Sequence, residues 1–257
     1  MCKELVEKAR LAREILHDNT PYKESKDAIK SLFISDTGLP YREVVSLRLT
    51  VIDRYYSTNM SKRYYGIQDI TSSLMQLGKN DSELVRSFKI FISNNIRRNS
   101  SVLKLFDQKY GVTKEGEDAG GATSLVSKYA YFITNYQFPI YDSLAKESYK
   151  IIARNYPQLG LAKIKESQIY SYFQCFQKLN DYFNDYDLLD NLLWLLGKIK
   201  KGNLSLIVPK KTYLLLKQDT EDLTLNKLSD AVSNVSSVRC LLGDKLCEFI
   251  SFIKRLK

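Results

Sequence analysis

Residues 120–143 read GGATSLVSKYAYFITNYQFPIYDS, and this stretch predicts two consecutive helices with a break between them. Gly120 and Gly121 precede a run whose apolar side chains recur at helical spacing, and glycine permits positive φ angles and close approach of a ligand to the backbone. A helix that begins there exposes free amides, which can bind a phosphate. Pro139 ends the run, because the residue before a proline is disfavoured in the α region. Asp142 then stands at the start of the second helix, where a carboxylate can act as a cap.

This arrangement resembles the helix-hairpin-helix DNA glycosylase superfamily, in particular the divergent branch related to 8-oxoguanine DNA glycosylases. In that superfamily a glycine-rich hairpin holds a DNA phosphate, and an aspartate that follows a proline is catalytic. Asp142 follows Thr123 by 19 residues (142 − 123), which matches the family's spacing from hairpin to carboxylate. LDNLLWLLGK, residues 189–198, is similar to the Leu-Trp-x-x-Gly-Lys ending of that branch. The resemblance covers residues 40–200 and implies that Asp142 is the catalytic carboxylate.

The hairpin departs from the family pattern in two places. Its usual Leu-Pro-Gly-Val-Gly sequence is absent, and Thr123 stands where members with a lyase step carry a lysine. The resemblance therefore implies a monofunctional enzyme that uses water. Lys128 is the nearest lysine and the second catalytic candidate, either as an amine that forms a Schiff base with the sugar or as a phosphate contact. It follows Thr123 by five residues, about 140° around a helix, so we expect it to point away from the cleft that Thr123 faces.

The charge of the chain favours a polyanionic partner. The net charge is +10, and eleven Lys and Arg stand against four Asp and Glu between Arg54 and Lys114. Basic residues that contact phosphates supply most of the salt-dependent affinity for DNA. A solvated helix surface on a basic protein is the alternative interpretation of the pairs at 62–63 and 97–98. The expected DNA-binding residues are Gly120, Gly121, Thr123, Lys62, Arg63, Arg97 and Arg98.

Aromatic side chains around the break at residues 57–59 are candidates for base stacking. A glycosylase must extrude its base from the duplex, and tyrosines can stack on unpaired bases. Packing at a corner between helices is the alternative for each tyrosine, because most of the 18 tyrosines are expected to be half-buried packing residues. Asn59 can hydrogen-bond a base edge. The wedge or stacking candidates are Tyr55, Tyr56, Asn59 and Tyr64, with Tyr65 beside them.

Composition argues against several other classes of enzyme. One histidine and four cysteines without a CxxC pair predict no metal site and no histidine-dependent triad. No P-loop, GxGxxG, HExxH or GxSxG sequence is present, and we expect no cofactor. The absence of a signal peptide and of a membrane-spanning apolar run predicts a cytoplasmic protein, nucleoid-associated in a bacterium. The expected partner is duplex DNA that carries a damaged or modified base, with no membrane, and the sequence leaves the oligomeric state open.

The remaining pattern is helical almost throughout, which predicts an all-α protein. We expect a helix-hairpin-helix glycosylase-like domain over residues 1–203, with two helical lobes around a cleft, and a small extension over residues 204–257. Residues 112–121 are expected to be the least structured internal segment. The extension begins with two β-prone runs that are expected to pair as a short β-hairpin, residues 204–208 and 212–216.

The predicted function is that of a DNA glycosylase, a DNA-repair hydrolase that performs base excision on a damaged or modified base. Two alternatives stay open: a non-catalytic nucleic-acid-binding helical protein, and an interaction or regulatory protein of a defence or toxin–antitoxin type. A glycosylase predicts a cleft that contains Asp142 beside the hairpin amides. The binding protein predicts a basic face with Asp142 buried as a helix cap, and the interaction protein predicts an apolar patch in the tail.

Overall fold

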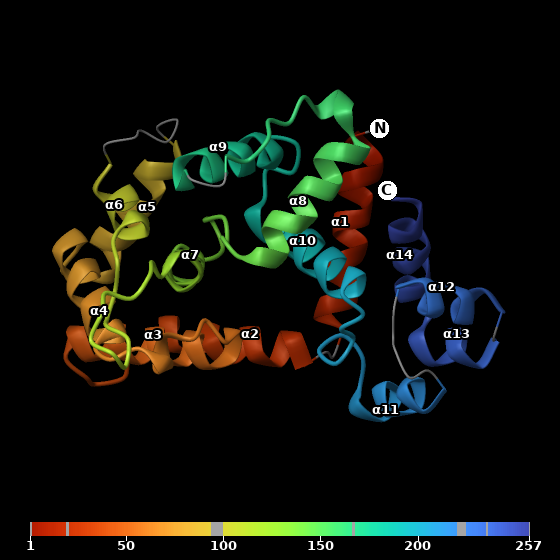
Figure 1. The fold of residues 1–257 in the computed structure, drawn as a ribbon, viewed down its shortest axis with the longest axis horizontal. Helices are drawn as coiled ribbons and strands as arrows, with labels where there is room; N and C mark the ends of the chain where they lie inside the picture. The colour runs from red at the N-terminus through yellow and green to blue at the C-terminus, as the bar shows by residue number, and fades with distance from the viewer. Residues whose placement is uncertain are drawn as a thin grey trace. The chain divides into compact units, whose positions relative to one another are not determined.

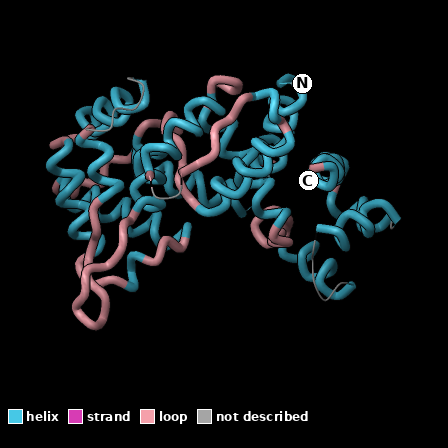
Figure 2. Tube along the Cα trace, turned by 45° about the horizontal axis from the view of Figure 1, so that its top comes forward, coloured by secondary structure: helices cyan, strands magenta, loops and turns pink. Residues whose placement is uncertain are grey.

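The computed structural model describes residues 2–18, 21–93, 100–165, 168–219, 225–234 and 236–256. Over these ranges the fold is all-α, as predicted, with isolated β-bridges and no β-strand (Figure 1). Figure 2 shows the same helices and the loops that join them. The chain divides into two compact units, each made of separate segments. Unit 1 comprises Met1–Lys26, Ser143–Lys163 and Leu179–Lys257, and unit 2 comprises Asp27–Asp142 and Ile164–Lys178.

Unit 2 is built around one helix that is buried along most of its length. Its elements are α2 (Pro21–Ile34, from Asp27 onward), α3 (Tyr41–Tyr56), the 3₁₀ helix η1 (Met60–Lys62), α4 (Gly66–Leu77), α5 (Asp81–Ser93), α6 (Ser101–Asp107), α7 (Thr123–Ile133) and most of α9 (Ile169–Asn180). The central helix, α7, packs against α3, α5 and α6 (Figure 1). Every residue from Leu125 to Ile133 is buried, so polar side chains of α7 in this stretch must find partners inside the protein.

Phenylalanine side chains fill the core beside α7. The ring centroid of Phe138 lies 5.3 Å from that of Phe88, 6.0 Å from that of Phe106 and 5.5 Å from that of Phe173. Edge-to-face and offset arrangements at these distances are favourable for aromatic rings. The partners come from α5, α6 and α9, so this cluster fixes the residue that precedes Pro139.

Unit 1 is organised around α10, whose central residues are nearly all buried. Its elements are α1 (Cys2–His17), the start of α2, α8 (Ser143–Asn155), η2 (Pro157–Leu159), α10 (Tyr186–Lys200), α11 (Lys210–Asp219), α12 (Leu225–Asn234), α13 (Ser236–Leu242) and α14 (Asp244–Arg255). Helix α10 packs against α1 and α8. Gly197 allows the close approach of α8, because a Cβ there would lie 3.0 Å from the Ser148 hydroxyl oxygen and 3.1 Å from Leu144 Cδ2.

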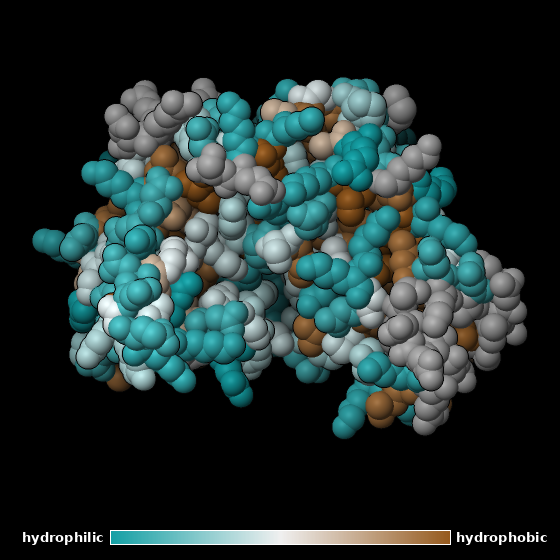
Figure 3. All heavy atoms as spheres, viewed as in Figure 1, coloured by the Kyte–Doolittle hydropathy of each residue, from teal (hydrophilic) through white to brown (hydrophobic). Residues whose placement is uncertain are grey.

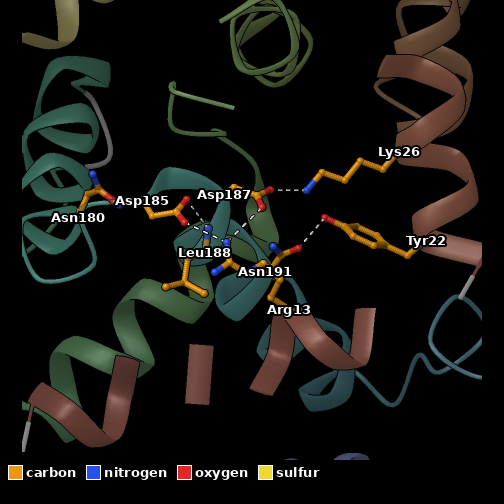
Figure 4. Close-up of polar contacts among 8 residues, drawn as sticks. All are labelled: Arg13, Tyr22, Lys26, Asn180, Asp185, Asp187, Leu188 and Asn191. Atoms are coloured by element: carbon orange, nitrogen blue, oxygen red, sulfur yellow. Dashed lines mark hydrogen bonds and ion pairs between the residues drawn. The ribbon is translucent and has the colours of Figure 1, made fainter. Parts of the chain in front are cut away.

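Polar side chains tie the start of α10 to α1 and to the start of α2 (Figure 4). Asp185 caps α10 by accepting a hydrogen bond from the backbone N–H of Leu188 at 3.0 Å, which satisfies one of the free amides of the first turn. Arg13 pairs with Asp185 at 3.0 Å, and Lys26 pairs with Asp187. These pairs fix the beginning of the most buried helix in the unit.

The predicted β-hairpin in the C-terminal segment is wrong. Residues 204–208 form turns, with the N–H groups of Ile207 and Val208 both donating to the Leu204 carbonyl. Helix α11 begins just after Pro209. Proline suits the start of a helix, since its fixed φ matches the helix and its missing N–H is not needed there. This local effect outweighs the β-prone composition of residues 212–216.

The boundary expected at residue 203 does not coincide with the division into units, because the C-terminal helices belong with α1 in unit 1. Helix α14 packs against α1 and α10. Two ion pairs connect α1 with α14: Glu14 pairs with Lys245 at 3.0 Å, and Glu4 pairs with Arg255 at 3.4 Å. Gly243, with φ +75°, separates α13 from α14.

Candidate active site

Two hydroxyl groups hold the segment that leads to Asp142. No regular helix lies between α7 and Asp142, in agreement with the break predicted at Pro139. The Ser127 hydroxyl oxygen accepts a hydrogen bond from the Tyr141 N–H at 2.9 Å. The Tyr172 hydroxyl donates to the Ile140 carbonyl at 2.6 Å.

Asp142 lies against a lysine from α7. The Nζ atom of Lys128 is 3.0 Å from Oδ2 of Asp142. The lysine side chain is 3% exposed and the aspartate side chain 20%, so the pair is largely, though not completely, shielded from solvent. A charge-assisted hydrogen bond of this length is stronger than one between neutral groups. The two residues proposed as catalytic from the sequence are thus brought together.

Lys128 has two further partners. Its Nζ donates to the Ser124 hydroxyl oxygen at 2.7 Å, and it lies 5.1 Å from the ring centroid of Tyr56, within the range of a cation–π contact. Tyr56, predicted as a wedge or stacking residue, therefore forms one side of the lysine's surroundings. Its own ring lies 6.3 Å from that of Phe132 in the core.

Asp142 lies on the side of α7 that Lys128 faces, not on the side that Thr123 faces. Thr123 and Lys128 do diverge, as the helical angle predicts, but the Thr123 hydroxyl donates to the carbonyl of Phe106 at 3.4 Å. It is Lys128 whose head group reaches Asp142. The path of the chain after α7 causes this difference, because it brings Asp142 back to the side of α7 on which Lys128 lies.

The two adjacent glycines do not adopt the expected backbone conformation. Neither Gly120 nor Gly121 has a left-handed φ, and a Cβ on either would meet no atom closer than 3.6 Å. The position that requires glycine is Gly111, with φ +72° and a Cβ that would lie 2.6 Å from the Tyr64 carbonyl oxygen. Arg63 binds the glycine pair, donating through Nη1 to both of its carbonyls.

The loop before α7 is ordered, contrary to the prediction that residues 112–121 are the least structured internal segment. Val112 forms antiparallel bridges with Tyr64 and with Asp118. The Thr113 N–H donates to the Glu117 carbonyl at 2.8 Å. Backbone hydrogen bonds hold this loop in one conformation. The polar, glycine-containing composition of the loop does not reveal these bonds.

The start of α7 presents unpaired backbone amides next to these glycines. Among the described residues, the N–H groups of Thr123, Ser124 and Leu125 have no acceptor, while that of Val126 donates to the Ala122 carbonyl. Free first-turn amides and the helix dipole favour an anion at this end. Gly120 and Gly121 are exposed, and Thr123 and Ser124 are half-buried, so this end of α7 is partly open to solvent.

A buried aspartate shapes the loop that follows α3. Asp53 accepts hydrogen bonds from the Thr58 hydroxyl and, at 2.9 Å, from the Met60 N–H. Ser57 and Asn59 have left-handed φ angles of 50° and 64°, which are uncommon for residues other than glycine. Such strain is maintained where surrounding contacts enforce it and is concentrated at functional sites.

Exposed tyrosines surround this loop. Tyr55, Tyr64 and Tyr65 are 50%, 57% and 68% exposed. Tyr64 is held rigidly, because its backbone exchanges two hydrogen bonds with Val112, at 3.1 and 3.0 Å. These three rings are available to a partner, unlike that of Tyr56.

The side chains predicted to contact phosphates differ in their exposure, and two of them lie outside the described residues. Lys62 is exposed, Arg63 is half-buried and Thr123 is half-buried. Arg97 and Arg98 lie outside the described residues. In Figure 3, hydrophilic residues are spread over the displayed face, with hydrophobic residues visible between them.

Sequence reasoning missed the groups that hold the site together. Ser124 lies four residues before Lys128, a spacing that places two side chains on one helix face, so it was detectable. Ser127 and Tyr172 carry no local signal, since their partners lie 14 and 32 residues away in the chain. In the described part of the chain, no cluster of three His, Cys, Asp or Glu residues could hold a metal ion.

Comparisons of the chain with protein-family models, with curated proteins and with solved structures find no match. Among the helices of the described ranges, none has the length and apolar character needed to cross a membrane.

Proposed function

We propose that this protein is a DNA glycosylase of the helix-hairpin-helix type, with Asp142 as its catalytic carboxylate and water as the nucleophile. The observation that carries the proposal is the contact between Lys128 and Asp142, 3.0 Å long and mostly shielded from solvent. Charged pairs in shielded positions are costly unless their geometry is good, and they are frequent at catalytic sites.

The chemistry follows from the charge of the carboxylate. As the N-glycosidic bond breaks, its electron pair leaves with the base and positive charge develops on the sugar. An aspartate beside that sugar stabilises the charge and can accept a proton from the water that attacks C1′. Lys128, held by Asp142, Ser124 and Tyr56, is assigned the role of orienting the carboxylate, and no Schiff base is part of the proposal.

The surroundings support DNA as the substrate. Free amides at the start of α7 suit a phosphate, and the exposed rings of Tyr64 and Tyr65 suit unpaired bases. Arg63 connects the exposed tyrosines to the start of α7. It directly precedes Tyr64 in the chain, and its side chain donates to the carbonyls of Gly120 and Gly121. Phosphate contacts and base stacking are both needed to extrude a base from a duplex.

The decisive experiment is incubation with duplexes that carry a panel of lesions, followed by alkali to cleave abasic sites. We expect the wild-type protein to release at least one base and Asp142→Asn to release none while it still binds the duplex. Asp118→Asn is the matched control, because this aspartate is highly exposed and its side chain pairs with the exposed Lys109. Excision by Asp142→Asn at a rate near that of the wild type would refute the assignment.

A second candidate is a nucleic-acid-binding protein without catalysis. This candidate is favoured by the three partners of Lys128, because a lysine held by three partners can also serve only to stabilise the fold. In that case the wild type binds DNA but releases no base from any duplex. Asp142→Asn then lowers the unfolding temperature and leaves the binding of unmodified DNA unchanged at temperatures where it is folded.

A further inference from the structure

We propose that Ser127 and Tyr172 are positioning residues that set the location of the Asp142 carboxylate. This inference rests on the proposed function and deepens it, because it assigns a role in the reaction to two residues that do not touch the substrate. Both act on the two residues that immediately precede Asp142.

The two hydroxyls bind neighbouring peptide groups. Ser127 accepts from the Tyr141 N–H at 2.9 Å and donates to the Ser124 carbonyl at 3.0 Å. Tyr172 donates to the Ile140 carbonyl at 2.6 Å. One contact comes from α7 and the other from α9, so the backbone before Asp142 is held from two helices.

The hydroxyls of Ser127 and Tyr172 provide the hydrogen bonds that a helix or sheet would otherwise provide to this backbone segment. A buried backbone N–H or carbonyl needs a partner, and this segment has no helix or sheet to supply one. Ser127 and Tyr172 are fully buried, so water does not readily substitute for either hydroxyl. Without them the segment keeps its anchor at Phe138 but loses the contacts that direct Asp142 toward Lys128.

The ring of Tyr172 is held in place by neighbouring aromatic rings. Its ring centroid lies 4.0 Å from that of Phe176, in a stacked arrangement, and 4.2 Å from that of Tyr141. The hydroxyl is therefore fixed relative to α9, and its position is transmitted to the segment. A displacement of about 1 Å at a reacting group can reduce a rate by about a hundredfold.

The test compares two buried tyrosines that make the same kind of contact. Tyr172→Phe removes the bond to Ile140, and Tyr110→Phe removes a 2.7 Å bond from Tyr110 to the Leu105 carbonyl together with hydrogen bonds to Ser73 and Gln108. We expect both variants to lose thermal stability, and Tyr110→Phe to lose at least as much as Tyr172→Phe. Only Tyr172→Phe should lower kcat, by about ten- to a hundredfold, with KM unchanged.

Ser127→Ala has its own control in Thr134→Val. Thr134 is buried at the end of α7 and donates to the Ala130 carbonyl at 2.7 Å, so its loss reports the structural effect of removing a hydroxyl. Ser127→Ala should lower kcat as Tyr172→Phe does, and Thr134→Val should not. Equal kcat values in each variant and its control would overturn the proposal.

A spectroscopic readout separates this proposal from the proposed function. The ammonium protons of Lys128 should give a slowly exchanging NMR signal in the wild type, which weakens in Tyr172→Phe and Ser127→Ala but not in the two controls. If the wild type excises no base, the proposed function fails and this signal alone decides the positioning role. An unchanged signal in Tyr172→Phe and Ser127→Ala would refute that role.

Discussion

Lys128 and Asp142 are fourteen residues apart in the chain, yet their charged groups lie 3.0 Å from one another. The lysine belongs to the most buried helix of unit 2, and the aspartate ends the irregular segment that follows that helix. Neither group is placed by local structure alone. Their contact depends on the turn after α7, on Phe138 in the aromatic core and on the hydroxyls of Ser127 and Tyr172.

Substitution of Lys128 should distinguish an orienting role from a nucleophilic one. We expect Lys128→Met to reduce excision by about ten- to a hundredfold, since Asp142 loses its partner. Lys128→Arg, which keeps the charge, should retain more activity. Borohydride should trap no covalent adduct between the wild-type protein and DNA, because no imine forms with the sugar. An adduct that disappears in Lys128→Met would assign the nucleophile to this lysine instead.

DNA binding should depend on salt through the basic span between Arg54 and Lys114. If about six phosphates are contacted, log affinity plotted against log salt should have a slope of roughly −5. Lys62→Gln should flatten the slope by about one unit, and neutralising Arg97 and Arg98 together by up to about two. Lys211→Gln, an exposed lysine in unit 1, is the control and should leave the slope unchanged. A salt-independent affinity would favour the interaction-protein alternative.

Alanine should lower stability at one glycine position and leave it nearly unchanged at another. Gly197→Ala places a Cβ 3.0 Å from the Ser148 oxygen and 3.1 Å from Leu144 Cδ2. Such overpacking costs about 1–3 kcal/mol, which at the middle of this range outweighs the roughly 1 kcal/mol that alanine gains over glycine in a helix. Gly120→Ala meets no atom within 4 Å and should change the unfolding free energy by less than about 0.5 kcal/mol. Urea unfolding measures both, and equal stabilities would contradict the close packing of α8 on α10.

Stability should fall at alkaline pH because buried tyrosines resist ionisation. Burial raises the pKa of Tyr110 to about 12, and burial also raises the pKa of Tyr129 and of Tyr186. Above the ordinary tyrosine pKa of about 10, the unfolded chain loses protons that the folded protein keeps, so stability decreases as pH rises. Tyr110 alone should remove about 1.4 kcal/mol between pH 8 and pH 11.

Urea unfolding at pH 8, 10 and 11 checks this decrease. Tyrosinate absorbance at pH 11 should also be lower for the folded protein than for the unfolded chain, because the buried tyrosines stay protonated. Tyr110→Phe should make the unfolding free energy less dependent on pH. An unfolding free energy that stays constant up to pH 11 would contradict the prediction.

Helix positions were largely predictable because they depend on local rules. Apolar spacing predicts helices over residues 3–17, 42–56 and 187–200, each within one residue of the bounds of α1, α3 and α10. Pro139 marks a real break, and Gly78 ends α4 as the pattern over residues 67–77 predicts. The β-hairpin at 204–216 failed because a proline at a helix start outweighed β-prone side chains. The expected left-handed φ angles at Gly120 and Gly121 failed because the tight approach in this loop occurs at Gly111 instead.

By itself the sequence determined the all-α class, the helix breaks and the excess of positive charge. These follow from composition and from residue spacing over a few positions of the chain. The resemblance to the glycosylase superfamily added Asp142 and Lys128 as catalytic candidates. Only the tertiary structure decided that Lys128 rather than Thr123 faces Asp142. That choice depends on the path of an irregular segment, and one carbonyl of this segment accepts a hydrogen bond from a buried hydroxyl 32 residues further along the chain.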